Sequence, residues 1–154
     1  MIDRVLVVCV GNICRSPMAE ALLRARLGRR PRFTVSSAGV SALVGHPADP
    51  AATELMRDRG IDISGHRARQ VTPELVAAHD LVLVMERGHE AAVLSIAPQA
   101  RGKVHCIGKF GSFDVPDPYR QPRAAFEEAL RLVERGIDDY ERAFWPPAIR
   151  KVHG

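Results

Sequence analysis

Short hydrophobic runs separated by helical patterns repeat along the chain. Residues 5–8 and 81–85 are apolar throughout and rich in β-branched side chains, which is typical of strands buried on both faces of a parallel sheet. Two further strands are expected within residues 32–36 and over residues 103–106, the second with fewer apolar positions. Because the strands alternate with helices, the pattern predicts an α/β fold with a four-stranded parallel sheet covered by helices on both faces.

The helices are marked by a capping residue followed by proline. Such pairs predict three helix starts, at Ser16-Pro17, at Asp49-Pro50 and, for a shorter helix, at Thr72-Pro73. Gly28 and Gly60 end the first two of these helices. Hydrophobic periodicity predicts two more helices, over residues 88–96 and 122–144, whereas the prolines of residues 113–119 predict a loop.

Length and composition are those of one globular domain. The chain has 154 residues, of which 46% are hydrophobic and 26% charged, which excludes a disordered chain and a disulfide scaffold. We expect the domain to span residues 1–145 and residues 146–154 to form a disordered tail that follows an exposed Trp145. Three cysteines are too few for a secreted framework, and the apolar run 5–10 is too short for a membrane span or leader, so we expect a cytoplasmic location.

The charge narrows the choice of partners only slightly. A net charge of +4 is compatible with nucleic acid, an anionic membrane or a phosphate ligand. The chain has no block of lysine and arginine and no aromatic residues interleaved with basic ones, so we expect no nucleic-acid partner and no membrane insertion. The six histidines lack the spacing of metal ligands, and the sequence predicts neither a metal nor a cofactor.

The segment that follows the first strand carries the candidate chemistry. Gly11 and Asn12 tolerate left-handed backbone conformations, so successive N–H groups can turn inward around an anion, and the next helix directs its N-terminus to the same place. Cys9 lies in this field, which favours a thiolate able to attack a phosphate ester. The planar guanidinium of Arg15 suits two phosphoryl oxygens, and the Ser16 hydroxyl can stabilise the thiolate as a leaving group.

Residues 8–17, Val-Cys-Val-Gly-Asn-Ile-Cys-Arg-Ser-Pro, resemble the phosphate-binding loop of the low-molecular-weight protein tyrosine phosphatases. The resemblance covers residues 4–144 and includes four shorter segments: Ser37-Ala38-Gly39, His66 with Arg69-Gln70, Met85-Glu86, and residues 114–119. It implies a single domain with strand order 2-1-3-4 and the phosphate loop after strand 1. It also implies a protein-tyrosine-phosphatase that hydrolyses phosphotyrosine through a phosphocysteine intermediate.

The site that these residues and the resemblance predict has three catalytic members. Cys9 is the expected nucleophile, Arg15 the phosphate-binding residue, and Asp117 the general acid and later the general base. Proline on both sides of Asp117 stiffens its backbone, whereas the neighbouring Asp114 is interpreted as a turn residue. Further residues are expected to bind phosphate or substrate (Val10, Gly11, Asn12, Ile13, Cys14, Ser16, Leu43 and Tyr119) or to brace the loop (Ser37 and His66).

The two other cysteines have different expected roles. Cys14 is either a packed loop residue or a redox partner, because residues five apart in a curled loop can come within the ~7 Å Cα separation that a disulfide requires. In the second case peroxide oxidises Cys9 to a sulfenic acid, and Cys14 captures it reversibly. Cys106 is expected to pack in the core.

Two positions depart from the eukaryotic members of the family. Leu43 lies in a loop where many of them have an aromatic residue, and Arg120 lies where a second tyrosine is common. Residues 37–50 and 117–120 instead resemble a bacterial branch paired with autophosphorylating tyrosine kinases of capsule and exopolysaccharide export. The expected partners are therefore phosphate and a phosphotyrosine protein, with the tail of such a kinase as a candidate.

Three alternatives remain at this point. An arsenate reductase of the same fold relays oxidation through two further cysteines, but only Cys106 lies beyond the loop. A cysteine-phosphorylated carrier also places a cysteine after the first strand, although it needs neither Arg15 nor Asp117. A phosphate-dependent binding module without catalysis is the third.

Overall fold

The computed structural model describes residues 2–147 and shows four parallel strands in one sheet. Their order is β2-β1-β3-β4, as expected. The strands are β1 (Arg4–Cys9), β2 (Thr34–Gly39), β3 (Leu81–Val84) and β4 (Val104–Cys106). The predicted strand within residues 32–36 therefore begins later and runs further than expected, up to the glycine that pairs with Cys9.

Five α-helices and one short 3₁₀ helix connect and cover the strands. They are α1 (Arg15–Leu27), α2 (Pro50–Asp58), α3 (Pro73–Ala77), α4 (Gly88–Ile96), the 3₁₀ helix Pro98–Ala100, and α5 (Arg123–Phe144). The Asp49 and Thr72 side chains cap α2 and α3 as predicted. The expected cap at Ser16 is wrong, because the N-cap of α1 is Cys14, two residues earlier, and the Ser16 hydroxyl is bonded to Asn12 and Cys9 instead.

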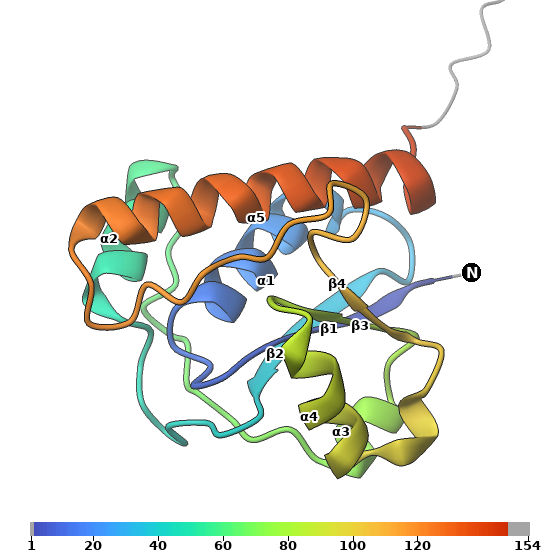
Figure 1. Ribbon diagram of the computed structural model, residues 1–154. Helices are drawn as coiled ribbons and strands as arrows, with labels where there is room; N and C mark the ends of the chain where they lie inside the picture. The colour runs from blue at the N-terminus through green and yellow to red at the C-terminus, as the bar shows by residue number, and fades with distance from the viewer. Residues whose placement is uncertain (1, 148–154) are drawn as a thin grey trace, which may run out of the picture.

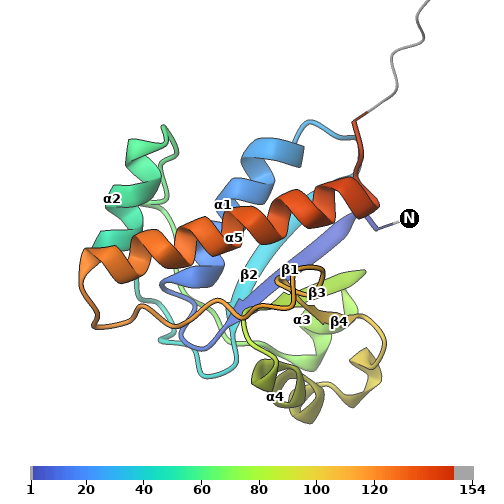
Figure 2. The same cartoon turned by 45° about the horizontal axis from the view of Figure 1, so that its top comes forward.

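The sheet is buried on both faces, which explains why its strands are apolar throughout. Figures 1 and 2 show α1, α2 and α5 on one side of the sheet and α3 and α4 on the other. Alternate residues of β1 serve the two sides: Val5 and Val7 pack in the core cluster that contains α1 and α5, and Leu6 and Val8 in the cluster that contains α3. No helix among residues 2–147 is long and apolar enough to cross a membrane.

Trp145 corrects the expectation for the end of the chain. Its side chain is only 3% exposed, its Nε1–H donates to the carbonyl oxygen of Ile2 at 2.9 Å, and its ring meets the Phe33 ring edge-on. Trp145 therefore anchors the end of α5 against the N-terminal end of the sheet and is not exposed. Most of the predicted tail, residues 148–154, lies outside the described residues.

The parallel arrangement brings distant segments together at one edge. The carboxyl ends of β1 and β2 meet where Cys9 pairs with Gly39, and β3 ends beside β1 where Val8 pairs with Val84. In open α/β sheets ligands bind at this edge, next to the point where the strand order reverses. The β1–α1 loop, the β2–α2 segment and the residues that follow β3 converge there.

Candidate active site

The β1–α1 loop is held in place by hydrogen bonds that its carbonyl groups accept from neighbouring segments. The backbone N–H groups of Ser41, Leu43 and Asp49 donate to carbonyl oxygens in the loop, at Val10 and Gly11 (3.0 Å each) and at Ile13 (2.8 Å). The fourth carbonyl in this run, that of Asn12, accepts from His66 Nε2 at 2.7 Å.

This outward direction of the carbonyls fixes where the amides point. In a planar trans peptide the N–H is opposite to the C=O of the same unit, so the N–H groups of residues 11–14 face the concave side of the loop. Asn12 makes this curl possible with a left-handed φ of 59°. A ring of inward N–H groups next to the start of α1 has the arrangement of an anion-binding nest.

Asn12 connects Ser16 and Ser37 through its side-chain amide. The Asn12 amide donates from Nδ2 to Ser16 Oγ at 2.8 Å and to Ser37 Oγ at 3.0 Å, and its Oδ1 accepts from the backbone N–H of Arg69. Because Ser16 Oγ already accepts from the amide, its own hydrogen is free for Cys9 Sγ, 2.9 Å away. A hydroxyl aimed at the sulfur stabilises a thiolate in preference to a thiol.

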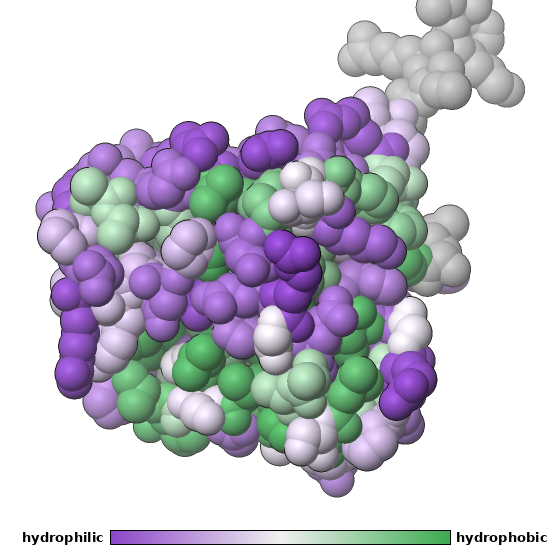
Figure 3. All heavy atoms as spheres, viewed as in Figure 1, coloured by the Kyte–Doolittle hydropathy of each residue, from purple (hydrophilic) through white to green (hydrophobic). Residues whose placement is uncertain are grey.

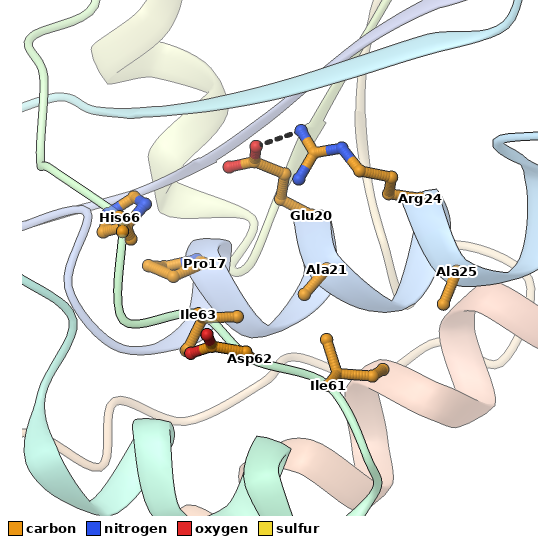
Figure 4. A pocket seen from close by; sticks show the side chains of 10 residues that line it. Pro17, Glu20, Ala21, Arg24, Ala25, Ile61, Asp62, Ile63 and His66 are labelled. Atoms are coloured by element: carbon orange, nitrogen blue, oxygen red, sulfur yellow. Dashed lines mark hydrogen bonds and ion pairs between the residues drawn. The ribbon is translucent and has the colours of Figure 1, made fainter.

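The same network continues to the far side of the loop. Ser37 Oγ donates to Glu20 Oε1 at 2.5 Å, and Glu20 also pairs with Arg24 one turn further along α1. Figure 4 shows Glu20, Arg24 and His66 around a second hollow of about 440 Å³, so the hydrogen-bonded chain that ends at Cys9 starts at this surface. His66 bonds to the Asn12 carbonyl and Ser37 to the Asn12 amide, and their role in bracing the loop stays a prediction.

Arg15 is the most deeply buried charge near the loop. Its side chain is 1% exposed, and its Nη1 donates to Glu86 Oε1 at 2.5 Å and to the Val115 carbonyl oxygen at 2.7 Å. Nη2 lies 3.7 Å from Asp117 Oδ2, and Nε is buried without a hydrogen-bond partner among residues 2–147. One edge of the guanidinium is therefore fixed, and the other retains unused donors in the wall of the cavity.

Asp117 lies at the mouth of the same cavity. Its side chain is 45% exposed, and its Oδ1 accepts from the backbone N–H of Tyr119 at 3.0 Å, which leaves Oδ2 facing Arg15. Asp114 instead accepts from the backbone N–H of Arg87 with Oδ1, outside the cavity lining. The two carboxyl groups are therefore separated: Asp117 lies at the cavity, whereas Asp114 lies outside its lining and pairs with Arg87.

The cavity has a volume of about 370 Å³ and combines an anion-binding floor with apolar walls. It is lined by Cys9, Val10, Gly11, Ile13, Cys14, Arg15, Ser41, Leu43, Asp117, Tyr119 and Arg120. Leu43, Val10 and Tyr119 are partly exposed at its rim. In Figure 3 hydrophobic residues gather in the lower part of the view, whereas polar residues predominate along the upper edge, where α5 runs.

The remaining cysteines differ in their surroundings. Burial, followed by the nearby charges of Asp49 and Cys9, raises the pKa of the Cys14 thiol far above its ordinary value. Cys106 is buried in the core cluster on the α3 side, as expected, and its burial and the Glu90 carboxylate raise its pKa to about 11. All three thiols are free, and the structure leaves the predicted redox pairing of Cys14 with Cys9 as a hypothesis.

Three functional positions were not identified from single residues in the sequence. Glu86 orients Arg15, Glu20 terminates the network behind the loop, and Gly39 allows the close approach of β2. A Cβ at Gly39 would lie 2.4 Å from the Val10 carbonyl oxygen, so only glycine fits there. Gly39 and Glu86 lie in two of the segments that carry the family resemblance, although no role was assigned to them there, whereas Glu20 gave no signal within its helix.

The fold and this site are those of a phosphate-monoester hydrolase, and a comparison with family models identifies the family. The model of the low molecular weight phosphotyrosine protein phosphatases matches residues 4–144, and the chain belongs to this family. The chain is therefore a member of the protein-tyrosine-phosphatases, as the sequence predicts.

Named relatives from bacteria agree with this assignment. The chain is 51% identical over 99% of both chains to the probable low molecular weight protein-tyrosine-phosphatase EpsP of Ralstonia nicotianae. It is 46% identical to the low molecular weight protein-tyrosine-phosphatase Wzb of Salmonella typhimurium, over 93% of this chain and 95% of that one. The structure of Vibrio vulnificus Wzb in complex with benzylphosphonate superimposes with a TM-score of 0.87 at 42% identity, covering 93% of this chain and 99% of the other.

Proposed function

We propose that this chain hydrolyses phosphotyrosine through a phosphocysteine at Cys9. The observation that carries the proposal is the free edge of Arg15: a buried guanidinium with an unused Nε lines the same cavity as a ring of inward amides and a sulfur. A phosphoryl group supplies the missing acceptors, because its oxygens match the planar fork of an arginine. The benzylphosphonate bound by the Vibrio vulnificus relative is a phosphonate attached to an aromatic ring through one carbon, which supports an aromatic phosphate ester here.

The chemistry follows in two steps. Cys9 Sγ attacks phosphorus in line, the bond from phosphorus to the tyrosyl oxygen breaks, and Asp117 gives that oxygen a proton. Asp117 then removes a proton from water as the water attacks phosphorus, the S–P bond breaks, and inorganic phosphate leaves. The Ser16 hydroxyl stabilises the departing thiolate, and Arg15 with the loop amides holds the three other phosphoryl oxygens throughout.

Turnover of p-nitrophenyl phosphate tests this mechanism in the wild type, Cys9→Ser and Asp117→Ala, with Cys106→Ala as a matched control remote from the cavity. We expect the Cys9→Ser variant to lose on the order of 10⁴-fold or more in kcat. Rapid quenching of the wild type should trap a phosphorylated cysteine. Hydrolysis that persists in Cys9→Ser would falsify the mechanism, and trapped phosphocysteine without turnover would identify a carrier instead.

The physiological substrate that we propose is a bacterial tyrosine autokinase of exopolysaccharide export. Support comes from the resemblance of residues 37–50 and 117–120 to that branch and from the bacterial origin of the matching relatives. A phosphorylated kinase from the same cell should lose its phosphotyrosine on incubation with the wild type and remain bound to Asp117→Ala. A phosphoserine protein serves as the control, and equal rates on both proteins contradict the assignment.

We further propose that Cys14 protects Cys9 from oxidation. Peroxide oxidises the Cys9 thiolate to a sulfenic acid; the Cys14 sulfur then attacks it, an S–S bond forms and water leaves. Because burial keeps Cys14 protonated in the resting enzyme, capture should accelerate at high pH, where more thiolate is present. Wild type inactivated by peroxide should recover activity with dithiothreitol, whereas Cys14→Ser should lose activity irreversibly; equal recovery of both contradicts the proposal.

A further inference from the structure

Among the described residues 2–147, Arg120 is the one cavity-lining residue that the mechanism does not use and that carries a positive charge without an ion-pair partner. It is exposed, and no carboxylate within residues 2–147 lies within 4.0 Å of its guanidinium nitrogens. The guanidinium carbon lies 5.2 Å from the centroid of the Tyr119 ring, which also lines the cavity. Stacking on an aromatic face fixes the plane of the guanidinium and leaves its N–H donors pointing outward.

The backbone holds Arg120 at this place in an unfavourable conformation. Its φ is 62°, in the left-handed region that β-carbon-bearing residues other than asparagine and aspartate rarely adopt. The turn is closed by a hydrogen bond from the Gln121 N–H to the Pro118 carbonyl oxygen at 2.9 Å. Arg32 has the same strain, with a φ of 68°, at the opposite end of the sheet. Arg120 differs from Arg32 in its position, because it lies over the Tyr119 ring and lines the cavity.

Arg120 is separate in role from Arg15. Arg15 is buried beside the phosphate loop and lines the cavity, whereas Arg120 lines the same cavity and is exposed to solvent. A peptide that places its phosphotyrosine in the cavity must pass its neighbouring residues across this entrance. In an extended chain two residues span about 6.6 Å, which is within the reach of an arginine side chain.

We propose, on the basis of the phosphatase activity above, that Arg120 is a specificity residue that binds a second anionic group of the substrate within two residues of the phosphotyrosine. The group is a carboxylate or a phosphate, both of which accept two parallel N–H bonds from a guanidinium. The preferred substrates are therefore phosphotyrosines in acidic segments or next to other phosphotyrosines. Among the described residues that line the cavity, Asp117 alone carries a carboxylate, and it belongs to the same segment as Arg120.

A set of phosphotyrosine peptides tests this assignment through kcat/KM. The reference peptide has alanine at every position that flanks the phosphotyrosine. In a second set, each peptide has a single aspartate at one of the four positions within two residues of the phosphotyrosine. A third set has a single lysine at the same positions. We expect the wild type to prefer aspartate over alanine by about three- to tenfold at one or more positions, with a smaller preference at high salt. The Arg120→Glu variant should reverse the preference at the same position in favour of lysine.

The neutral variant and its control separate charge from backbone effects. Asparagine tolerates a left-handed φ, so Arg120→Asn keeps the turn and removes the charge. Arg32→Asn makes the same change at an exposed, equally strained arginine remote from the cavity and should keep the wild-type preference. The inference fails if the wild type shows no preference for acidic peptides, or if the preference survives unchanged in Arg120→Asn.

Two further comparisons complete the test. If neither the wild type nor any variant hydrolyses the alanine peptide, the proposed phosphatase function itself fails. If the wild type hydrolyses that peptide but shows no preference for the aspartate peptides, only the role of Arg120 fails. A peptide with a second phosphotyrosine, compared with one that has aspartate at the same position, identifies the source of the anion. A gain with both peptides indicates acidic segments in general, and a gain with the second phosphotyrosine alone indicates clustered phosphotyrosines.

Discussion

The phosphate loop and the segment Asp117–Arg120 line the same cavity but are built in opposite ways. Apart from Val10 and Gly11 the loop is buried, its carbonyls accept bonds from the β2–α2 segment and from His66, and both hydrogens and the oxygen of the Asn12 amide are bonded. The acid segment is exposed except at Pro118, and it is held by its prolines and by two local bonds, from Tyr119 N–H to Asp117 and from Gln121 N–H to the Pro118 carbonyl oxygen. The phosphoryl group is the same in every substrate, whereas the residues around the phosphotyrosine vary. A fixed floor and an open rim suit these two demands.

Replacing Arg15 breaks the fixed region most severely. Arg15→Lys removes the planar fork that joins Glu86 and the Val115 carbonyl oxygen to the phosphoryl oxygens, and we expect kcat/KM to fall on the order of 10³-fold. Stopped assays with p-nitrophenyl phosphate measure the loss. Glu86→Gln, which keeps a hydrogen-bond acceptor beside Nη1, should lose much less, and an equal loss in both variants contradicts the separation of binding from orientation.

Replacing Asp117 tests the exposed region through the leaving group. Asp117→Asn cannot supply a proton, and we expect kcat to fall about 10²-fold with phenyl phosphate. The loss should be smaller with p-nitrophenyl phosphate, because its phenolate leaves more easily without protonation. Asp114→Asn is the matched control and should retain activity, since its carboxylate bonds to Arg87 outside the cavity. Equal losses on the two substrates contradict a general-acid role.

Gly39→Ala probes the fixed region from its outer side. The new Cβ would lie 2.4 Å from the Val10 carbonyl oxygen, so β2 or the loop must shift. We expect about a tenfold loss of kcat/KM and a loss of about 1–3 kcal/mol in the free energy of unfolding. Gly65→Ala is the control, since a Cβ there meets nothing within 4 Å. Urea unfolding and steady-state kinetics measure both quantities, and a Gly39→Ala variant with unchanged kcat/KM indicates that the loop tolerates displacement.

The two regions also differ in how well the sequence predicted them. The buried strands, the cysteine loop and the Asp-Pro segment depend on local patterns, so their types and places were predictable from hydrophobic runs, glycine and proline. Two other features join residues that are far apart in the sequence or lie on one helix face. They are the ion pair of Arg15 with Glu86 and the series of hydrogen bonds from Glu20 to Cys9. Such contacts depend on how β3 and α1 pack against β1, which no local pattern encodes. Trp145 was misjudged for the same reason, because its partner Ile2 lies at the other end of the chain.

A change remote from both regions separates lost stability from lost chemistry. Asp80 accepts from the backbone N–H groups of Asp3 and Arg4 at the amino ends of β1 and β3, and these bonds lower its pKa from 3.8 to about 2. A carboxyl with a lowered folded-state pKa contributes stability that is present above pH 4 and is lost as the pH falls toward 2. After allowance for solvent screening, we expect Asp80→Asn to cost about 1 kcal/mol at pH 7. The difference from wild type should shrink in urea unfolding below pH 4, while kcat/KM at pH 7 stays at the wild-type value. A fall in kcat/KM that matches the loss of stability contradicts the view that the phosphate loop is held by its own contacts.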